Sequence, residues 1–336
     1  MMHELKHIVS AYKKAKEMNL KSVLATVVDL DGSSYRKPGV RMLIIENGNM
    51  IGAVSGGCVE KEVLRQAQSV FLDGRPKMMT YDGRYRLGCE GVIYILIEKF
   101  TPKDEFIIKF DTALINREPL KIKSKYIKEE GVYKDIGSFV AMGGNKFSLS
   151  GLMDIAKPQN LYIQELRPCF KLIIFGAEHD AVQLCKLAFA TGWEVEVVSG
   201  ISEPKTIENF PGASSCVSST AETYDFTSID SETAIMVMTH SFSNDLKWLL
   251  ALKDYNPAYL GLLGPVKKRE SLISQLLEYD PNISEKFIDS IHGPAGLNIG
   301  SITSQEIAIS IIAEILSVIR NQTPVSLKEK TGNIHV

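Results

Sequence analysis

Two glycine-flanked cysteines are the first residues whose types and spacing could do chemistry. Cys58 follows Ser55-Gly56-Gly57, where an apolar strand is expected to run into a helix capped by Ser55. The helix dipole favours the thiolate and lowers the pKa of a thiol in the first turn. Cys89 lies in the loop Leu87-Gly88-Cys89-Glu90-Gly91. The pattern predicts thiols that handle sulfur or a metal, and buried cysteines that only fill space are the alternative.

A second group of residues offers hydrogen-bond donors to an anion. It lies in the ten residues 32–41, which are expected to form a turn followed by a strand. Charged donors on a tight, glycine-containing backbone suit a ligand that carries a phosphate. A solvated basic hairpin is the alternative. The residues expected to hold the anion are Ser33, Ser34, Arg36 and Arg41.

Three histidines in the second half of the chain form a third group. His179 and His240 each follow a predicted strand, and His292 lies in a loop rich in glycine and proline. In an open α/β sheet, ligands bind beyond the carboxyl ends of the strands, so we expect the three to gather at one edge. Neutral imidazoles there could ligate a metal or donate to an oxyanion. The alternative is that each histidine hydrogen-bonds within its own loop, and no metal site is firmly predicted.

The loop that begins at Gly176 lies where a dinucleotide-binding loop would lie. Gly176 and Ala181 match the first and third positions of the fingerprint G-x-G-x-x-G/A. Glu178 takes the second position, where a carboxylate blocks and repels a pyrophosphate. Ser199 ends the second strand, where an acidic residue would hold the ribose. We therefore expect a Rossmann-like scaffold without ordinary NAD(P) binding, and an NAD(P)-dependent oxidoreductase is the alternative function.

The elements that position these residues fall into two halves. In the first half, a helix is expected from His3 to about Met18, and short strands and a second helix follow to about residue 98. This is an α/β or α+β domain, predicted to span residues 1–165, with 104–165 as its tail and a linker. In the second half, strands such as Lys171–Phe175 alternate with helices, which predicts a doubly wound parallel sheet over residues 166–322. Residues 323–336 are expected to be a loose tail.

Composition excludes several classes of protein. The chain has 336 residues, with 38 Lys and Arg against 40 Asp and Glu, so it lacks a general electrostatic attraction for nucleic acid or an anionic membrane. The five cysteines are scattered without a CxxC pair, which argues against a disulfide framework, a zinc ribbon and an iron–sulfur cluster. Charged residues interrupt the apolar positions near the start, so no signal peptide is expected. These features predict a soluble cytoplasmic protein.

Several motifs together resemble the XdhC/CoxI family of xanthine dehydrogenase accessory proteins. They include GSSYRKPGVRMLI (32–44), SGGCVEKEV (55–63), LGCEG (87–91), IIFGAEHDA (173–181), MTHSFSND (238–245) and YLGLLGPVKKRE (259–270). The resemblance implies a protein that binds molybdenum cofactor, protects it during sulfuration and delivers it to a xanthine dehydrogenase-type molybdoenzyme. Binding and delivery, rather than catalysis, are then the main activity. The resemblance also implies a cysteine desulfurase as a partner and a homodimer.

Three departures from the family's pattern refine the expected site. The family's GAGH loop is Gly176-Ala177-Glu178-His179 here, and its acidic residue is Ser199. Its GCGG motif is Gly88-Cys89-Glu90-Gly91, and the added carboxylate raises the pKa of the Cys89 thiol. We therefore rank Cys58 above Cys89 as the thiol that contacts molybdenum.

Overall fold

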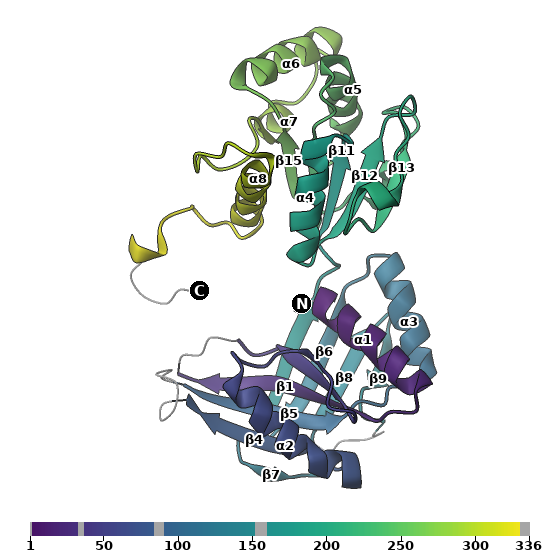
Figure 1. The fold of residues 1–336 in the computed structure, drawn as a ribbon, viewed down its shortest axis with the longest axis vertical. Helices are drawn as coiled ribbons and strands as arrows, with labels where there is room; N and C mark the ends of the chain where they lie inside the picture. The colour runs from purple at the N-terminus through teal and green to yellow at the C-terminus, as the bar shows by residue number, and fades with distance from the viewer. Residues whose placement is uncertain (1, 33–36, 84–90, 152–159, 330–336) are drawn as a thin grey trace. The chain divides into compact units, whose positions relative to one another are not determined.

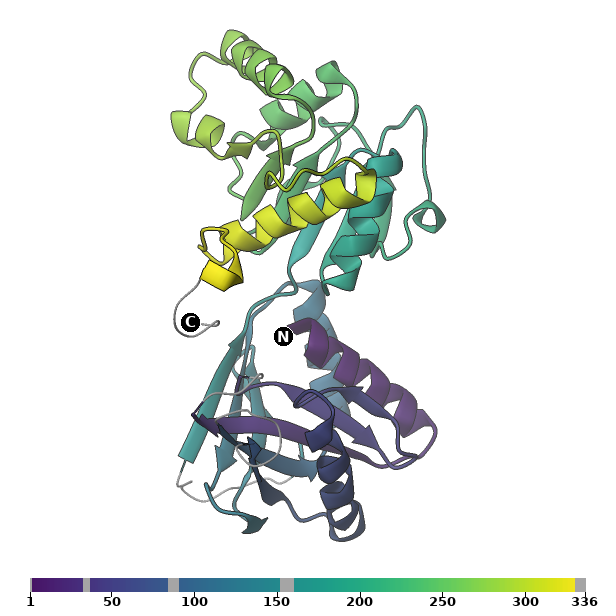
Figure 2. The same cartoon turned by 60° about the vertical axis from the view of Figure 1, so that its left-hand side comes forward.

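The computed structural model of the chain describes residues 2–32, 37–83, 91–151 and 160–329. It divides into two compact units, unit 1 from Met1 to Cys169 and unit 2 from Phe170 to Val336 (Figure 1, Figure 2). The sequence predicts the division after residue 165, and the structure places it four residues later. In the part of the chain that is described, no helix is both long and apolar enough to cross a membrane.

Unit 1 contains two antiparallel sheets. The six-stranded sheet has the order β3-β2-β1-β5-β4-β7 and the four-stranded sheet the order β10-β6-β8-β9. The strands of the first are β1 (Ser22–Asp31), β2 (Arg41–Ile45), β3 (Met50–Gly52), β4 (Lys77–Asp82), β5 (Val92–Lys99) and β7 (Gly131–Val132). Those of the second are β6 (Leu120–Tyr126), β8 (Gly137–Met142), β9 (Asn145–Ser148) and β10 (Asn160–Leu166).

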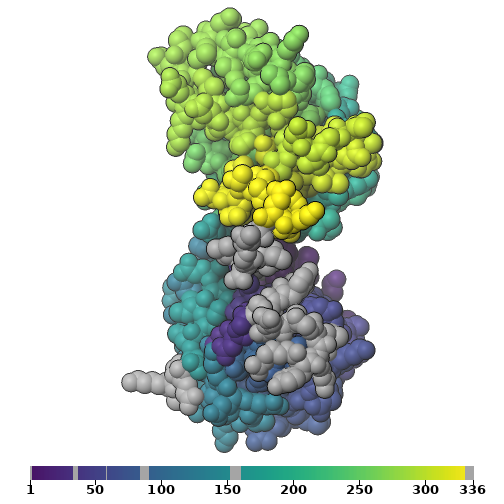
Figure 3. All heavy atoms as spheres, turned by 90° about the vertical axis from the view of Figure 1, so that its left-hand side faces the viewer, coloured from purple at the N-terminus to yellow at the C-terminus, as the bar shows by residue number. Residues whose placement is uncertain are grey.

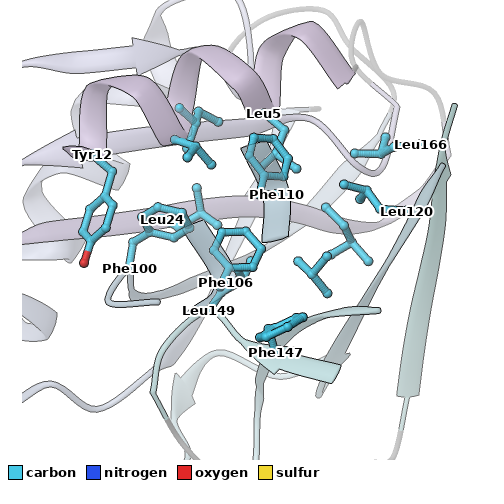
Figure 4. Packing of buried hydrophobic residues seen from close by; sticks show 14 of the residues in the cluster. Leu5, Tyr12, Leu24, Phe100, Phe106, Phe110, Leu120, Phe147, Leu149 and Leu166 are labelled. Atoms are coloured by element: carbon cyan, nitrogen blue, oxygen red, sulfur yellow. The ribbon is translucent and has the colours of Figure 1, made fainter. Parts of the chain in front are cut away.

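Helices cover the six-stranded sheet on both faces. The helices of unit 1 are α1 (Met2–Glu17), α2 (Cys58–Asp73) and α3 (Asp104–Ile115). Helix α2 buries Val59, Val63, Ala67 and Val70 against one face, a spacing that follows the helical repeat. On the other face, α1 and α3 share a core with the four-stranded sheet. In this core the rings of Tyr12 and Phe100 pack edge to face, with 5.0 Å between their centres (Figure 4).

Residues 104–165 are part of this core, although the sequence predicts a tail and a linker there. The segment contains α3 and all four strands of the second sheet apart from the last residue of β10. The segment contributes five large side chains to the hydrophobic cluster that also contains the buried residues of α1. They are Phe106, Phe110, Ile122, Val140 and Phe147. It therefore supplies one of the two sheets of unit 1.

Unit 2 is a parallel doubly wound sheet, which confirms the predicted fold class. Its order is β13-β12-β11-β14-β15-β16, and every pairing in it is parallel. This order is that of a Rossmann fold, with the sequence of strands reversing beside β11. The strands are β11 (Lys171–Phe175), β12 (Glu194–Ser199), β13 (Ser215–Ser218), β14 (Thr233–Val237), β15 (Tyr259–Leu262) and β16 (Ile291–His292).

Helices cover both faces of this sheet too (Figure 1, Figure 2). Leu172 and Ile174 of β11 pack with α4 and α8, and Ile173 and Phe175 pack with α5, α6 and α7. The helices are α4 (His179–Ala190), α5 (Phe242–Leu252), α6 (Val266–Tyr279), α7 (Glu285–Asp289) and α8 (Ser304–Ile319). The end of α8 and the exposed residues after it lie on the surface of unit 2, yellow in Figure 3.

Candidate functional site

A buried carboxylate holds the turn that precedes α2. The Glu60 carboxylate accepts hydrogen bonds from the Ser55 amide at 2.7 Å, the Ser55 hydroxyl at 2.8 Å and the Gly57 amide at 2.8 Å. Burial acts to raise the pKa of Glu60, but these hydrogen bonds outweigh it and keep the pKa below 4.5. The N-cap is Gly57 rather than the predicted Ser55, because Ser55 lies two residues earlier and donates to Glu60 instead.

No described residue fills the space beside the two glycines of this turn, at the start of α2. A Cβ atom added to Gly56 or Gly57 would meet no described atom within 4 Å. Gly57 also has a φ of 122°, which side-chain-bearing residues rarely adopt. Cys58 is the first residue of α2, and its side chain lies outside what the structure describes. Among the described residues, nothing blocks a ligand from the backbone that leads into Cys58.

Four other predicted residues lie outside the described ranges. They are Ser33, Ser34, Arg36 and Cys89. Their roles in holding an anion, or in handling sulfur or a metal, stay predictions.

Strand β1 ends near two carboxylates, those of Asp29 and Asp31, that are hydrogen-bonded and paired with a lysine. Asp29 accepts a hydrogen bond from Tyr126 at 2.5 Å, and Asp31 accepts one from Tyr94 at 2.8 Å. The Lys128 ammonium lies 3.1 Å from Asp29 and 2.7 Å from Asp31. Its single positive charge offsets part of the negative charge of the two carboxylates at this end of β1.

Arg41 does not share a site with the turn before α2. It pairs with Thr26 across β1 and β2, on the face of the sheet opposite to α2. Its Nη1 donates to the Gly39 carbonyl at 2.8 Å and to Gln164 Oε1 at 2.5 Å. Arg41 is only 6% exposed, and burial lowers its pKa to about 10. The guanidinium therefore lies between the two sheets of unit 1, not on an open anion-binding turn.

Glu98 shares that buried layer, although no sequence motif singles it out. Its Oε2 accepts from the Ser138 amide at 3.0 Å, and its Oε1 has no hydrogen-bond partner among the described residues. Burial raises the pKa of Glu98 to about 7, while hydrogen bonding by Ser138 and the charge of Arg41 oppose the rise. Strand periodicity could have identified it, since Glu98 takes the same face as Leu96 and Phe100.

The glycine of the nucleotide-type loop in unit 2 has a structural explanation. A Cβ atom on Gly176 would lie 2.2 Å from the carbonyl oxygen of Met238, so the ends of β11 and β14 can meet only at a glycine. Glu178 is exposed at the N-cap of α4. Ser199 is buried and lies 2.8 Å from the Ser218 hydroxyl.

A cavity of about 490 Å³ lies at the carboxyl ends of β11, β12 and β14. Glu178, Glu203 and Glu222 contribute carboxylates to its lining, and Lys247 contributes a cation 3.7 Å from Glu222. The remaining polar lining is mainly hydroxyl groups, including that of Ser199. A carboxylate-rich cavity does not suit a pyrophosphate, as the sequence predicts from Glu178 and Ser199.

Two of the three histidines have carboxylate neighbours of their own. The His240 Nε2 lies 3.6 Å from Asp180, and the His292 Nδ1 lies 3.3 Å from Glu314. His179 is exposed as the first residue of α4. Across the described residues, no three His, Cys, Asp or Glu side chains are arranged to hold a metal ion. His292 is within hydrogen-bonding distance of Glu314 on α8, and His240 faces Asp180 on α4 at a longer distance, so both partners come from helices outside the histidines' own loops.

Comparison with protein families gives two matches. Residues 16–82 match the model described as the XdhC and CoxI family. Residues 172–315 match the model described as the XdhC Rossmann domain. The first match includes the turn before α2, and the second includes nearly the whole sheet of unit 2.

Three known proteins resemble the chain over most of its length. A protein of Bacillus subtilis named as a probable xanthine dehydrogenase subunit is 30% identical over 321 residues, covering 88% of this chain and 92% of that protein. The molybdenum cofactor insertion chaperone PaoD of Escherichia coli is 25% identical, covering 88% of this chain and 83% of that protein. The crystal structure of a xanthine dehydrogenase from Bacillus halodurans has a TM-score of 0.77 and 25% identity, and covers 95% of this chain and 97% of that one.

Proposed function

Because the chain belongs to the XdhC and CoxI family, we propose that it binds molybdenum cofactor and delivers it to a molybdoenzyme of the xanthine dehydrogenase type. The Escherichia coli relative is named a molybdenum cofactor insertion chaperone, and the Bacillus subtilis relative a probable xanthine dehydrogenase subunit. The first name supports a role in cofactor insertion, and the second supports a link to xanthine dehydrogenase. The cofactor is the cargo of such a protein and not a resident group.

The open turn before α2 is the observation that carries the proposal. No described atom fills the space beside Gly56 and Gly57, and Glu60 holds the turn from its buried side. Cys58 follows at the start of a 16-residue helix, where the helix dipole favours a thiolate. Molybdenum in this cofactor is a soft, sulfur-ligated centre, so a cysteine thiolate is a suitable ligand for it. Cys58 is the residue proposed to contact it.

The cofactor also carries a phosphate, which needs donors close to this turn. Ser33, Ser34 and Arg36 are proposed to supply them, and Arg41 is no longer included because it lies on the opposite face of the sheet. Cys89 is proposed as a second, weaker thiol because Glu90 adds a negative charge beside it. Formation of the sulfurated cofactor, contact with a cysteine desulfurase, a homodimer and a cytoplasmic location belong to the same proposal.

Loading the protein with cofactor tests the proposal. The chain is produced in cells that make molybdenum cofactor, and the purified protein is analysed for molybdenum by mass spectrometry and for pterin by fluorescence after oxidation. Both should co-purify with the unaltered chain, and Cys58→Ala should lose most of both. Cys216→Ser, in the partly buried β13, is the matched cysteine control and should retain them. Absence of pterin from the unaltered chain would contradict the proposal.

Delivery is tested separately from binding. The loaded protein is mixed with a cofactor-free enzyme of the xanthine dehydrogenase type, and enzyme activity is followed with time. Activity should rise with the loaded chain and stay at the background level with Cys58→Ala. If cofactor binds but activity does not rise, the chain stores the cofactor without delivering it, and the delivery part of the proposal is wrong.

A further inference from the structure

The outer face of the four-stranded sheet in unit 1 has a row of lysines between two apolar rows. Lys121, Lys123 and Lys125 alternate along β6 with residues whose side chains face the core. Strand β10 places Leu161 opposite Lys125 and Ile163 opposite Lys123, and these two side chains are 46% and 48% exposed. We call this surface the lysine face.

Strand β8 provides the second apolar row of the lysine face. Phe139 pairs with Lys123 and Ala141 pairs with Lys121. The Lys146 ammonium lies 4.1 Å from the centre of the Phe139 ring, and that of Lys125 lies 6.0 Å from it. The two ammonium groups thus lie over the face of the Phe139 ring, which is only 4% exposed.

Positive charge is concentrated on this face although the chain has a net charge of −2. The described residues that line its cavity of about 830 Å³ include five basic side chains and one acidic side chain, Glu165. Glu165 pairs with Lys121 at 2.6 Å, and basic side chains outnumber acidic ones among the described residues of the lining. Lys146 and Arg167 extend the positive field to both sides of the Lys121–Lys125 row.

We propose that the lysine face docks an extended acidic segment of a partner protein. Alternate side chains of a strand are about 6.6–6.8 Å apart, so the lysines of β6 match carboxylates at every second position of an extended chain. The exposed side chains of Leu161 and Ile163 can pack against the methylene groups and neighbouring side chains of that segment. Electrostatic complementarity of this kind speeds association and selects the partner more than it increases affinity. The proposal does not depend on cofactor binding at Cys58.

Fluorescence anisotropy with a defined probe tests this surface on the full-length chain. The probe is a fluorescein-labelled peptide of alternating glutamate and threonine, and its glutamine counterpart is the uncharged control. The acidic peptide should bind saturably at low salt and more weakly as sodium chloride screens the charges. The glutamine peptide should not bind. Equal binding of both peptides overturns the proposal.

Charge reversal locates the binding surface. Lys123→Glu with Lys125→Glu should weaken binding at least about tenfold, and the neutral pair Lys123→Gln with Lys125→Gln should weaken it less. The matched control reverses the exposed Lys109 of α3 and Lys286 of α7 and should leave binding unchanged. If both lysine-face variants lose the far-ultraviolet circular dichroism of the folded chain, hydrogen exchange of the unaltered chain is measured with and without the acidic peptide. Absence of peptide-induced protection in β6 overturns the proposal.

Competition separates a polypeptide from a small anion. Inorganic phosphate and ATP are added to the bound peptide at matched ionic strength. Displacement no greater than that caused by sodium chloride supports a polypeptide partner. Stoichiometric binding of ATP at the same lysines overturns it in favour of a small-molecule site.

Discussion

Replacing Glu98 by glutamine should remove a pH-dependent weakness of unit 1. Glu98 is fully buried, and one of its carboxylate oxygens has no hydrogen-bond partner in the described part of the chain. Burial raises its pKa to about 7 from the ordinary 4.5. The folded protein therefore keeps a proton on Glu98 in a pH range where the unfolded chain has already lost it.

The difference between these pKa values sets the size of the effect. Between pH 4.5 and about 7 the folded state binds more protons than the unfolded state, so the free energy of unfolding falls as the pH rises. The total fall is about 3 kcal/mol once the pH exceeds both values. Below pH 4.5 both states are protonated and the penalty is absent. Glutamine carries no such proton, so Glu98→Gln should flatten this dependence.

Hydrogen exchange read by mass spectrometry is the suitable assay. Both tryptophans, Trp193 and Trp248, belong to unit 2, so tryptophan fluorescence does not report on unit 1. Exchange of the β1 and β5 amides, corrected for the pH dependence of the intrinsic rate, gives the opening free energy. It should fall between about pH 5 and about pH 8 in the unaltered chain and stay level in Glu98→Gln.

An exposed carboxyl of the same unit serves as the control. Glu165→Gln changes a carboxylate on the outer face of the four-stranded sheet. Hydrogen bonding by Lys121 lowers the pKa of Glu165. This variant should keep the fall in opening free energy between about pH 5 and about pH 8. If the opening free energy of the unaltered chain is constant or rises over this range, the argument from burial of Glu98 is refuted.

Three further predictions concern the turn before α2 and the loop after β11. Glu60→Gln should lower the stability of unit 1 by about 1 kcal/mol near neutral pH. The difference from the unaltered chain should shrink in acid, because hydrogen bonds hold the pKa of Glu60 below 4.5. Equal melting temperatures of the variant and the unaltered chain at all pH values would contradict this. Gly176→Ala should destabilise unit 2 by more than about 1 kcal/mol, because its Cβ would clash with the Met238 carbonyl; urea unfolding followed by tryptophan fluorescence measures this, and an unchanged midpoint would count against it. Titration with NADH and NADPH should give no saturable binding below the millimolar range, because Glu178 lies where a pyrophosphate would lie; sub-millimolar binding would restore the oxidoreductase alternative.

The sequence predicts the elements of unit 2 well because its strands are buried on both faces. Lys171–Phe175 has the predicted bounds, since a continuous apolar run that ends at a glycine has few other interpretations. Residues 104–165 are different. Strand β10 exposes Leu161 and Ile163 and turns Gln164 inward, so its apolar alternation is the reverse of what a core-facing strand predicts.

The candidate site is less predictable than the fold because strand parity and capping decide it. An arginine at position 41 indicates an anion site. However, neighbouring residues of β2 face opposite sides of the sheet, so a shift of one residue decides whether a side chain faces α2 or the four-stranded sheet. Glu60 lies at the third position of α2, where a carboxylate that accepts from the N-cap amide is expected, so the local sequence contains that information. Strand periodicity places Glu98 on an inward face, but its hydrogen-bond partner Ser138 belongs to a second sheet that the sequence does not reveal.

Molybdenum K-edge X-ray absorption of the cofactor-loaded protein is the most direct test of the proposed site. Comparing the unaltered chain with Cys58→Ser measures whether the thiol at the start of α2 binds the metal. The unaltered chain should show one more molybdenum–sulfur contact than the variant. Identical sulfur coordination per bound molybdenum atom in both proteins would contradict a cargo site built on Cys58.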